Sequence, residues 1–446
     1  MKTTLRNALF WISDWLKGSK VRRHFDSIRK IHQDHESEYS KRVRKEYVSE
    51  ILKHCSHTVP YYRNLGINNI SLEQFPVLDK NLIKENYSSF LSDIYLNKET
   101  FKATTSGSTG TPFTVLHNKD KKRRHTADVR YFWEAVGHAF GTRFYYLRIW
   151  TNQNRKSKIV QKRQNIVPVD VFKLDDKSIQ AFLEDVGSTN SPKSILGYAS
   201  VLDRIVKYTQ QHPIDMSNAN VVSIIAMSES LDIPTKNALI DIFDCPVVSR
   251  YANTECGMLA QQTSKFQDDF LANFASYHIE ILELHTNTPV KEGKIGRIIV
   301  TDLFNRAMPL IRYDTGDLGR LDTSKNNGKT HFVFKKVEGR KMDTIYDTKG
   351  EPISSFTLTN NMWKYSELSQ YQFIQVSKHE YIFKLNVPGK FSREQELVKE
   401  FTGYLGKDAT IHIEYVDEIP LLSSGKRKKV LNKFTLQGEK EKKIID

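Results

Sequence analysis

Strand-like and helix-like segments alternate through the middle of the chain, and this alternation constrains the fold more than any other feature. Short apolar segments typical of strands occur at 194–198, 221–226 and 247–251. Helical periodicity occurs between them, at 178–186, 200–211 and 234–243. Because strands that alternate with helices usually pair in parallel, we predict a layered α/β fold.

The rest of the chain divides into further units. A length of 446 residues exceeds what one compact core supports, so we expect at least two domains. Residues 1–60 have a mostly helical pattern, and residues 341–446 have the pattern of a small α+β module. We predict a large N-terminal domain at 1–340, with layered α/β sheets plus a barrel-like β subdomain, and a small, mobile C-terminal lid domain at 341–446. The expected elements before this boundary include a helix at 119–140 and strands at 277–284, 296–302, 310–313 and 331–337.

The composition limits the partners. Lys and Arg number 67 against 52 Asp and Glu, and a net charge of +15 favours anionic partners such as nucleotides, nucleic acid or a lipid surface. The sequence contains no RNP-like aromatic motif and no zinc finger, so we expect no nucleic-acid function. The three cysteines are far apart and have no zinc-site spacing, which favours a reducing, cytoplasmic location.

The first helix has two interpretations. An apolar stripe is followed directly by four basic residues, and an interfacial helix on an anionic membrane has this pattern. A helix packed on the protein's own core has the same pattern, and we take this second arrangement as the expected one. Charges interrupt the stripe, so we expect neither a signal peptide nor a membrane span. The stripe is Leu5, Leu9, Trp11, Ile12, Trp15 and Leu16, and the basic residues are Lys17, Lys20, Arg22 and Arg23.

A loop rich in Thr, Ser and Gly at 104–112 is the first candidate for a ligand site. Its glycines allow a tight turn close to a ligand, and its hydroxyl and N–H groups suit a polyphosphate. A solvated turn has the same composition. The Walker pattern is excluded, because Thr323 occupies the glycine position required before Gly328-Lys329-Thr330. A phosphate-binding loop without lysine requires a cation from elsewhere in the chain.

Four later segments fit a nucleotide site. The segment 251–257 follows a buried strand, where α/β sheets place ligands, and its Glu255 could hold Mg²⁺ while Tyr251 stacks on a base. Asp317 follows a Gly turn and could accept hydrogen bonds from a ribose. Arg340 lies at the predicted domain junction, and Lys426 follows a Ser-Ser-Gly turn that could swing it into a site. Taken singly, these segments are a strand end, a hairpin, a basic linker and a basic tail.

Together and in this order, the five segments resemble the motifs of the adenylate-forming superfamily of acyl-CoA synthetases and related ligases. The family has a Thr/Ser/Gly phosphate loop, Tyr-x-x-Thr-Glu, Tyr-x-Thr-Gly-Asp, a Gly-Arg hinge and a late Ser-Gly-Lys. The shorter length is similar to the phenylacetate–CoA ligase branch and its relatives from capsular-polysaccharide loci. Two positions depart from the pattern: Phe113 stands where much of the superfamily has lysine, and Met342 where it has a charged pivot.

The resemblance implies a role for each matching residue. It implies catalytic roles for Lys426, Thr109 and Glu255, with Glu255 also as the Mg²⁺ ligand. It implies an acyl pocket at Tyr198 and Ala199. It implies ATP binding by Thr104, Thr105, Ser106, Gly107, Ser108, Thr109, Gly110, Ser228, Glu229, Ser230, Tyr251, Ala252, Asn253, Thr254, Asp317 and Arg340.

The resemblance also implies a reaction. ATP, with Mg²⁺, would activate a carboxylic acid as an acyl-adenylate, and the acyl group would pass to coenzyme A or to an amine, in cell-surface polysaccharide biosynthesis. Two alternatives stay open: a membrane-associated capsule-assembly factor that contacts the membrane through residues 1–24, and a catalytically decayed nucleotide-binding homologue. The presence of Lys426 and Glu255 argues against decay.

Overall fold

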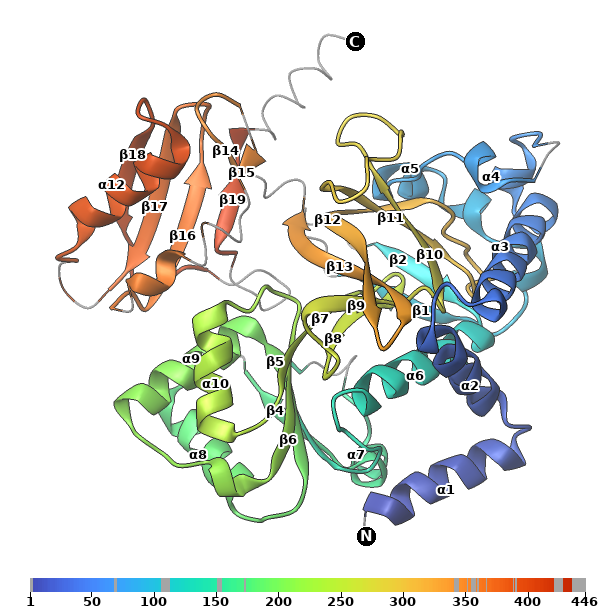
Figure 1. The fold of residues 1–446 in the computed structure, drawn as a ribbon, viewed down its shortest axis with the longest axis horizontal. Helices are drawn as coiled ribbons and strands as arrows, with labels where there is room; N and C mark the ends of the chain where they lie inside the picture. Colours follow the sequence, from blue (N-terminus) through green and yellow to red (C-terminus); the bar gives the residue numbers. More distant parts are fainter. Residues whose placement is uncertain are drawn as a thin grey trace.

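The computed structural model describes residues 3–67, 70–105, 113–150, 155–171, 174–340, 345–350, 352–353, 358, 361–365, 367–387, 389, 391–420 and 428–434. One long twisted sheet runs through the large domain (Figure 1). Among the described residues it has eleven strands, in the order β10-β11-β12-β13-β9-β8-β7-β6-β5-β3-β4. Their bounds are β3 Arg143–Arg148, β4 Ile166–Asp170, β5 Lys193–Tyr198, β6 Val221–Met227, β7 Val247–Asn253, β8 Gly257–Thr263, β9 Phe266–Ala272, β10 Tyr277–Leu282, β11 Gly296–Asp302, β12 Tyr313–Asn326 and β13 Lys329–Arg340.

The sheet has a parallel half and an antiparallel half, which meet at β7. Strands β4, β3, β5, β6 and β7 pair in parallel, as the strand–helix alternation predicts. Helices α8 (Asp176–Gly187), α9 (Ala199–Gln211) and α10 (Ile233–Phe243) contribute to the buried cluster on one face of this half. The end of α6 (Lys119–Glu134) packs on the other face through Trp133. The predicted α/β class is therefore confirmed.

The antiparallel half corrects the predicted β subdomain. Its strands continue the sheet from β7 in linear order, and no pair among the described strands closes them into a barrel. β8 and β9 were not predicted, because all seven residues of β8 are buried and its sequence therefore lacks the alternation of a half-exposed strand. The strand predicted at 310–313 is wrong, since β12 begins only at Tyr313. The helix predicted at 119–140 ends at Glu134, shortly before Gly137 with φ of 86°.

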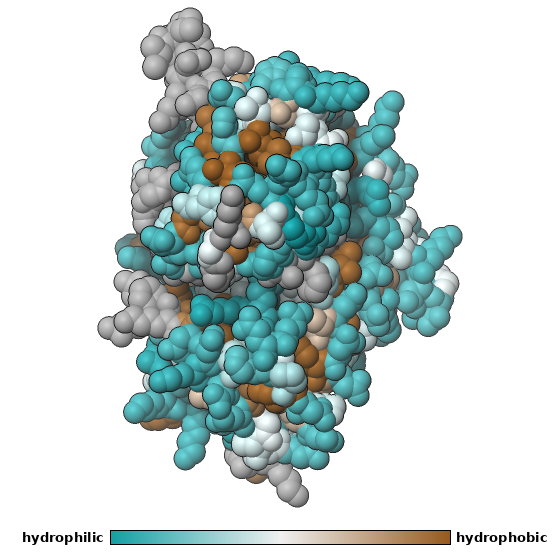
Figure 2. All heavy atoms as spheres, turned by 90° about the vertical axis from the view of Figure 1, so that its left-hand side faces the viewer, coloured by the Kyte–Doolittle hydropathy of each residue, from teal (hydrophilic) through white to brown (hydrophobic). Residues whose placement is uncertain are grey.

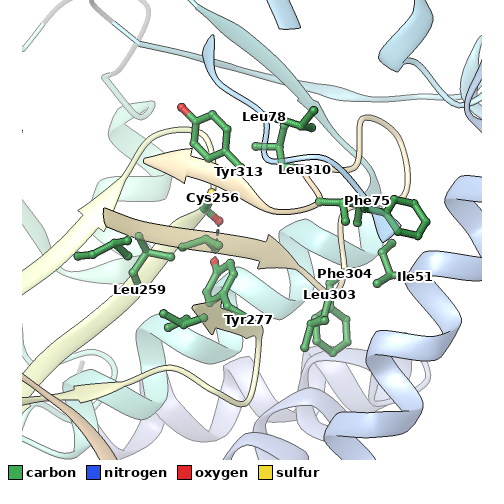
Figure 3. Close-up of a cluster of buried hydrophobic side chains, with 14 of the residues drawn as sticks. Ile51, Phe75, Leu78, Cys256, Leu259, Tyr277, Leu303, Phe304, Leu310 and Tyr313 are labelled. Carbon is green, nitrogen blue, oxygen red and sulfur yellow. Dashed lines mark hydrogen bonds between the residues drawn. The ribbon is translucent and has the colours of Figure 1, made fainter. Parts of the chain in front are cut away.

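Two more helices pack beside α6 at the N-terminal end. α2 (Lys20–Gln33) and α3 (Glu38–Thr58) contribute Phe25, Ile28 and Val43 to a small core with α6. The start of the chain then leads through α4 (Pro60–Arg63), α5 (Lys80–Glu85) and the β1–β2 hairpin (Phe101–Thr104 and Thr114–His117) to α6. These segments cover the antiparallel half of the sheet and bury a large hydrophobic core against it (Figure 3).

Helix α1 (Thr3–Leu16) lies at the edge of the large domain and corrects the expected packing of the first helix (Figure 1). The guanidinium of Arg130 in α6 lies 3.6 Å from the centroid of Phe10 and 4.6 Å from that of Trp11. Asp14 accepts hydrogen bonds from the backbone at the start of α2. The side of the helix with Phe10, Trp11 and Asp14 contacts the rest of the protein, and the aliphatic side therefore faces solvent. The exposed α1 stripe consists of Leu5, Leu9, Ile12, Trp15 and Leu16, which are 50%, 47%, 51%, 69% and 73% exposed.

The C-terminal module has a separate hydrophobic core. It contains a four-stranded sheet in the order β18-β17-β16-β19, packed on α12. The bounds are β16 Gln370–Gln375, β17 Glu380–Asn386, α12 Glu394–Leu405, β18 Thr410–Tyr415 and β19 Val430–Asn432. The module lies beside the parallel half of the large domain, and Lys207 of α9 donates to the carbonyl of Leu368. Figure 2 shows that the outer face on this side is mainly hydrophilic. We propose that the domain boundary at 340/341 follows this division of cores.

Within the described part of the chain, no helix is both long enough and apolar enough to cross a membrane.

Candidate functional site

The hairpin between β7 and β8 presents the segment 251–257. Asn253 turns the chain, because its Oδ1 accepts hydrogen bonds from the backbone N–H groups of Cys256 and Gly257, at 2.8 and 3.4 Å. Gly257 has a φ of 111°, and a Cβ there would lie 2.7 Å from Nδ1 of His125. This position requires glycine. The turn places Thr254 and Glu255 at the tip of the hairpin.

Glu255 is a buried carboxylate at this tip, only 3% exposed. Its Oε1 accepts a hydrogen bond from the Tyr313 hydroxyl at 2.9 Å, and its backbone carbonyl lies 2.8 Å from Nε2 of His117. Burial, and then the charge of Glu255, raise the pKa of the Tyr313 phenol well above its ordinary value, so this hydroxyl stays protonated and donates. The carboxylate is therefore held in a fixed orientation.

Lys80 supplies a cation that the sequence analysis missed. Its Nζ lies 2.6 Å from Oε1 of Glu255 and 5.8 Å from the ring centroid of Phe113. Asp79 caps α5 by accepting from the N–H groups of Asn81 and Leu82, which places Lys80 at the first position of the helix. Nothing in the local sequence distinguishes this lysine from the other basic residues of the chain. The ion pair with Glu255 depends on contacts between segments 175 residues apart.

The Thr/Ser/Gly loop starts close to this ion pair. Thr105 closes the base of the loop: its N–H donates to the carbonyl of Phe113 at 2.8 Å, and its Oγ1 accepts from the Phe113 N–H. Thr104 and Thr114 pair through their hydroxyls at 2.9 Å. Since Phe113 also contacts Lys80, a cation lies near the base of this lysine-free loop.

The second half of the site links the hairpin to β12. The Tyr251 hydroxyl donates to Oδ2 of Asp317 at 2.8 Å, and Asp317 is in register with Arg340 on β13. Burial, and then the charge of Asp317, raise the pKa of Tyr251 well above its ordinary value. The ring of Tyr251 is buried and packs edge-on against Phe334, so the phenol acts here as a hydrogen-bond donor that orients Asp317.

The remaining predicted residues lie at the carboxyl ends of β5 and β6. Oε2 of Glu229 accepts a hydrogen bond from the N–H of Ser200 at 2.9 Å, which joins the segment 228–230 to the start of α9. Tyr198 is in register with Met227, directly before Ser228. The predicted acyl-pocket residues Tyr198 and Ala199 therefore adjoin the predicted ATP segment.

Several predicted residues lie outside the described residues: Ser106, Gly107, Ser108, Thr109 and Gly110 of the loop, Met342, and Lys426. The side chain of Arg340 lies outside them as well. The roles assigned to these residues stay predictions.

The donor set fits a nucleotide with a divalent cation. In the described ranges, no group of three or more His, Cys, Asp or Glu side chains could hold a metal ion alone. Mg²⁺ is commonly bound by one or two carboxylates together with substrate phosphates and water, so the single buried carboxylate of Glu255 fits this mode. Lys80 adds a cation for phosphate oxygens, and Asp317 an acceptor for hydroxyl groups.

We expect Asp317→Ala to weaken ATP binding by about tenfold, because two ribose hydroxyls would lose a charged acceptor worth about 1.5–3 kcal/mol. Tyr251→Phe should weaken it less, since Asp317 would remain but lose the hydroxyl that orients it. Isothermal titration calorimetry with ATP measures both effects. Asp322→Ala, at a half-buried aspartate on the same strand, is the matched control. An affinity in Asp317→Ala equal to that of the control would contradict the role of Asp317.

Comparisons with known proteins show which families and folds this chain is similar to. The CapK C-terminal domain family matches residues 345–433. Protein CapK of Staphylococcus aureus is 22% identical over 402 residues, which cover 87% of this chain and 85% of CapK. Phenylacetate-coenzyme A ligase of Escherichia coli is 28% identical over 111 residues, a quarter of each chain.

A solved structure shares the fold over nearly the whole chain. A 2-hydroxyisobutyryl-CoA ligase in the postadenylation state, in complex with 2-HIB-AMP, superposes with a TM-score of 0.71 and 13% identity, covering 93% of this chain and 94% of the ligase. The two-domain fold of adenylate-forming ligases is therefore present here. Fold and sequence relatives together confirm the resemblance: the chain is similar to CapK over most of its length and to a phenylacetate-coenzyme A ligase over a shorter segment, and it shares the fold of an acyl-CoA ligase.

Proposed function

We propose that the protein is an ATP-dependent ligase that activates a carboxylic acid as an acyl-adenylate and transfers the acyl group to coenzyme A. The observation that carries the proposal is the meeting of distant motifs at one edge of the sheet. The Tyr313 hydroxyl bonds to Glu255, the Tyr251 hydroxyl bonds to Asp317, and Arg340 lies in register with Asp317. Relatives named as CoA ligases support the reaction class.

The chain's own residues have defined tasks in this reaction. A carboxylate oxygen of the acid forms a bond to the α-phosphorus of ATP, while the bond from that phosphorus to the bridging oxygen breaks and pyrophosphate leaves. Lys80 and Lys426 stabilise the negative charge on the phosphate oxygens, which is the main catalytic requirement of phosphoryl and adenylyl transfer. Asp317 orients the ribose. Mg²⁺, when bound at Glu255, neutralises phosphate charge.

In the second half-reaction the thiol of coenzyme A attacks the acyl carbon and loses its proton, and AMP leaves. An amine, for instance on a sugar, is the alternative acceptor, and the match to CapK supports a place in capsular-polysaccharide biosynthesis.

Pyrophosphate release from ATP in the presence of a panel of carboxylic acids tests the proposal. Hydroxylamine traps each adenylate as a hydroxamate, and coenzyme A or an amino sugar then serves as acceptor. We expect release that depends on the acid and is abolished by EDTA. Tight ATP binding without release for any acid would favour the alternative of a catalytically decayed nucleotide-binding homologue.

We further propose that α1 holds the protein on an anionic membrane surface. The exposed α1 stripe presents four aliphatic residues at positions i, i+4, i+7 and i+11, with Trp15 beside them. The acidic residue of this helix, Asp14, is buried, whereas Lys17, Lys20, Arg22 and Arg23 are exposed directly after the stripe. An apolar face bordered by cations is complementary to an anionic lipid surface.

Flotation with lipid vesicles tests this membrane contact. We expect the full chain to float with phosphatidylglycerol-containing vesicles and not with pure phosphatidylcholine, because both the apolar stripe and the cations contribute. The double variant L9E/I12E should reduce flotation by about tenfold or more, since burying carboxylates in the interface is costly. I159E, at an isolated exposed isoleucine of α7 (Lys158–Gln164), is the matched control. Absence of flotation, or a dimer that L9E/I12E dissolves, would show that lipid does not cover this face.

A further inference from the structure

One row of side chains crosses the carboxyl ends of the parallel strands. Tyr198 and Met227 are neighbours in the register of β5 and β6. The registers of β3 with β5 and of β6 with β7, continued by one residue, add Arg148 at one end and Arg250 at the other. In a parallel sheet, residues in register point to the same face. The row therefore carries an arginine at each end, with about 14 Å between the outer strands.

The row lies above an apolar floor. The residues two positions earlier on the same four strands are Tyr146, Leu196, Ile225 and Val248, which belong to the cluster under the C-terminal end of α6. Carboxyl ends of parallel strands are the usual place for a ligand in an α/β sheet. The Arg250 end adjoins the hairpin that carries Glu255, so the row begins at the nucleotide site and extends away from it toward Arg148.

In the described part of the chain, neither arginine has a counter-charge. Among the described residues, no carboxylate lies within 4.0 Å of either guanidinium, although Asp170 is the register neighbour of Arg148 and has contacts of its own. Arg250 donates through Nε to Gln261 at 3.0 Å, and its Nη2 is buried without a hydrogen-bond partner. A buried guanidinium nitrogen without a partner is unfavourable, and Arg148, which is half-buried without an anion, is available to bind one.

Aromatic groups hold Arg148 in place. Its guanidinium lies 5.4 Å from the ring centroid of Tyr146 and 5.5 Å from that of Trp150, and Nη1 donates to the Tyr146 hydroxyl at 3.3 Å. The indole N–H of Trp150 donates to two backbone carbonyls, of Tyr146 and Val169, which fixes the indole ring. Nε of Arg148 donates to the carbonyl of Ile149 at 3.3 Å, so the Nη2 side of the guanidinium is the part available for a planar or tetrahedral oxyanion.

We infer that the acid activated by this protein carries a second oxyanion group, a carboxylate or a phosphate, and that Arg148 binds this group at the end of the row distant from the nucleotide. This inference rests on the proposed ligase function for the identity of the ligand as an acid. Arg148 would then determine which acid is accepted. The preferred acids would carry two anionic groups, in contrast to aliphatic or aromatic acids with a single carboxylate.

Matched pairs of acids test the inference. The dissociation constants of adipate against hexanoate, and of 3-phosphoglycerate against glycerate, are measured by calorimetry with the full chain. The first pair isolates a distal carboxylate and the second a distal phosphate. We expect one dianionic member to bind at least tenfold more tightly than its partner, and Arg148→Gln to remove this preference while ATP affinity is unchanged. Arg148→Lys should retain part of the preference.

Arg143→Gln is the matched control, because Arg143 begins the same strand and pairs with Asp185 at 2.9 Å. Equal binding within both pairs, a preference that survives Arg148→Gln, or no binding of any of the four acids overturns the inference. Pyrophosphate release separates it from the proposed function. Release with hexanoate as fast as with adipate overturns the inference and keeps the ligase. Binding of adipate through Arg148 without release for any acid supports the inference and overturns the ligase.

Discussion

Replacing Lys426 by alanine should lower acyl-adenylate formation by about 100- to 1000-fold while ATP still binds, because this ammonium stabilises charge that develops only in the transition state. Lys426 lies outside the described residues, but the chain beyond it is anchored. Lys429 lies 5.5 Å from the ring centroid of Tyr371, and β19 pairs in parallel with β16. Lys429 lines a pocket together with Asp203 and Lys207 of α9, so the described residues that follow Lys426 lie on the side of the C-terminal module that faces α9.

The measurement compares ATP affinity by calorimetry with the rate of pyrophosphate release at saturating ATP. Lys433→Ala removes an exposed lysine just after β19 and serves as the control for the loss of one positive charge from the same module. A rate for Lys426→Ala within a few-fold of the control would show that another cation performs the task. Lys80, at 2.6 Å from Glu255, would be the first to examine.

The sequence predicted the fold class and the segments of the site, because both depend on local pattern. Strand–helix alternation indicated the parallel half of the sheet, and motif order indicated that the segments around Glu255 and Asp317 belong to one site. The hydrogen bonds from Tyr313 to Glu255 and from Tyr251 to Asp317 join these segments in the structure.

What the sequence did not predict depends on contacts between distant segments. In the sequence, no local pattern distinguishes Lys80 from other basic residues. Its ion pair with Glu255 forms only because α5 packs beside the β7–β8 hairpin. The stripe on α1 has the same periodicity whether it faces a core or solvent, and the contact of Arg130 with Phe10 decides between the two. The strand β8 has no alternation because both of its faces are buried, with Gln261 satisfied by the carbonyl of Phe132.

A second set of buried charged residues contacts the backbone next to Glu255. Lys121 of α6 and Asp302 at the end of β11 are both fully buried, with Nζ and Oδ2 2.6 Å apart. The same ammonium donates to the Tyr277 hydroxyl at 3.0 Å, and this hydroxyl donates to the carbonyl of Cys256 at 2.6 Å, next to Glu255 (Figure 3). The network therefore connects α6, the sheet and the hairpin that carries Glu255.

We expect Lys121→Met to lower the free energy of unfolding of the large domain by about 3–5 kcal/mol, because it leaves the buried carboxylate of Asp302 without a counter-charge. Asp302 also accepts from the N–H groups of Phe304 and Asn305 through Oδ1, and asparagine can keep these two hydrogen bonds. The double variant K121M/D302N should therefore recover most of the lost stability, since it removes both charges and keeps the backbone contacts.

Urea denaturation followed by tryptophan fluorescence measures the free energies of unfolding of the unchanged protein, of Lys121→Met, of Asp302→Asn and of the double variant. Lys335→Met is the matched control, because Lys335 pairs with Asp269 at the same 2.6 Å but at 29% and 20% exposure, where an ion pair contributes about 0–1 kcal/mol. A loss in Lys121→Met no larger than that of the control, or a double variant as unstable as the sum of its parts, would mean that Asp302 finds compensation elsewhere. We expect a large coupling free energy between residues 121 and 302. Burial removes the water that would otherwise solvate the charge left by a single substitution.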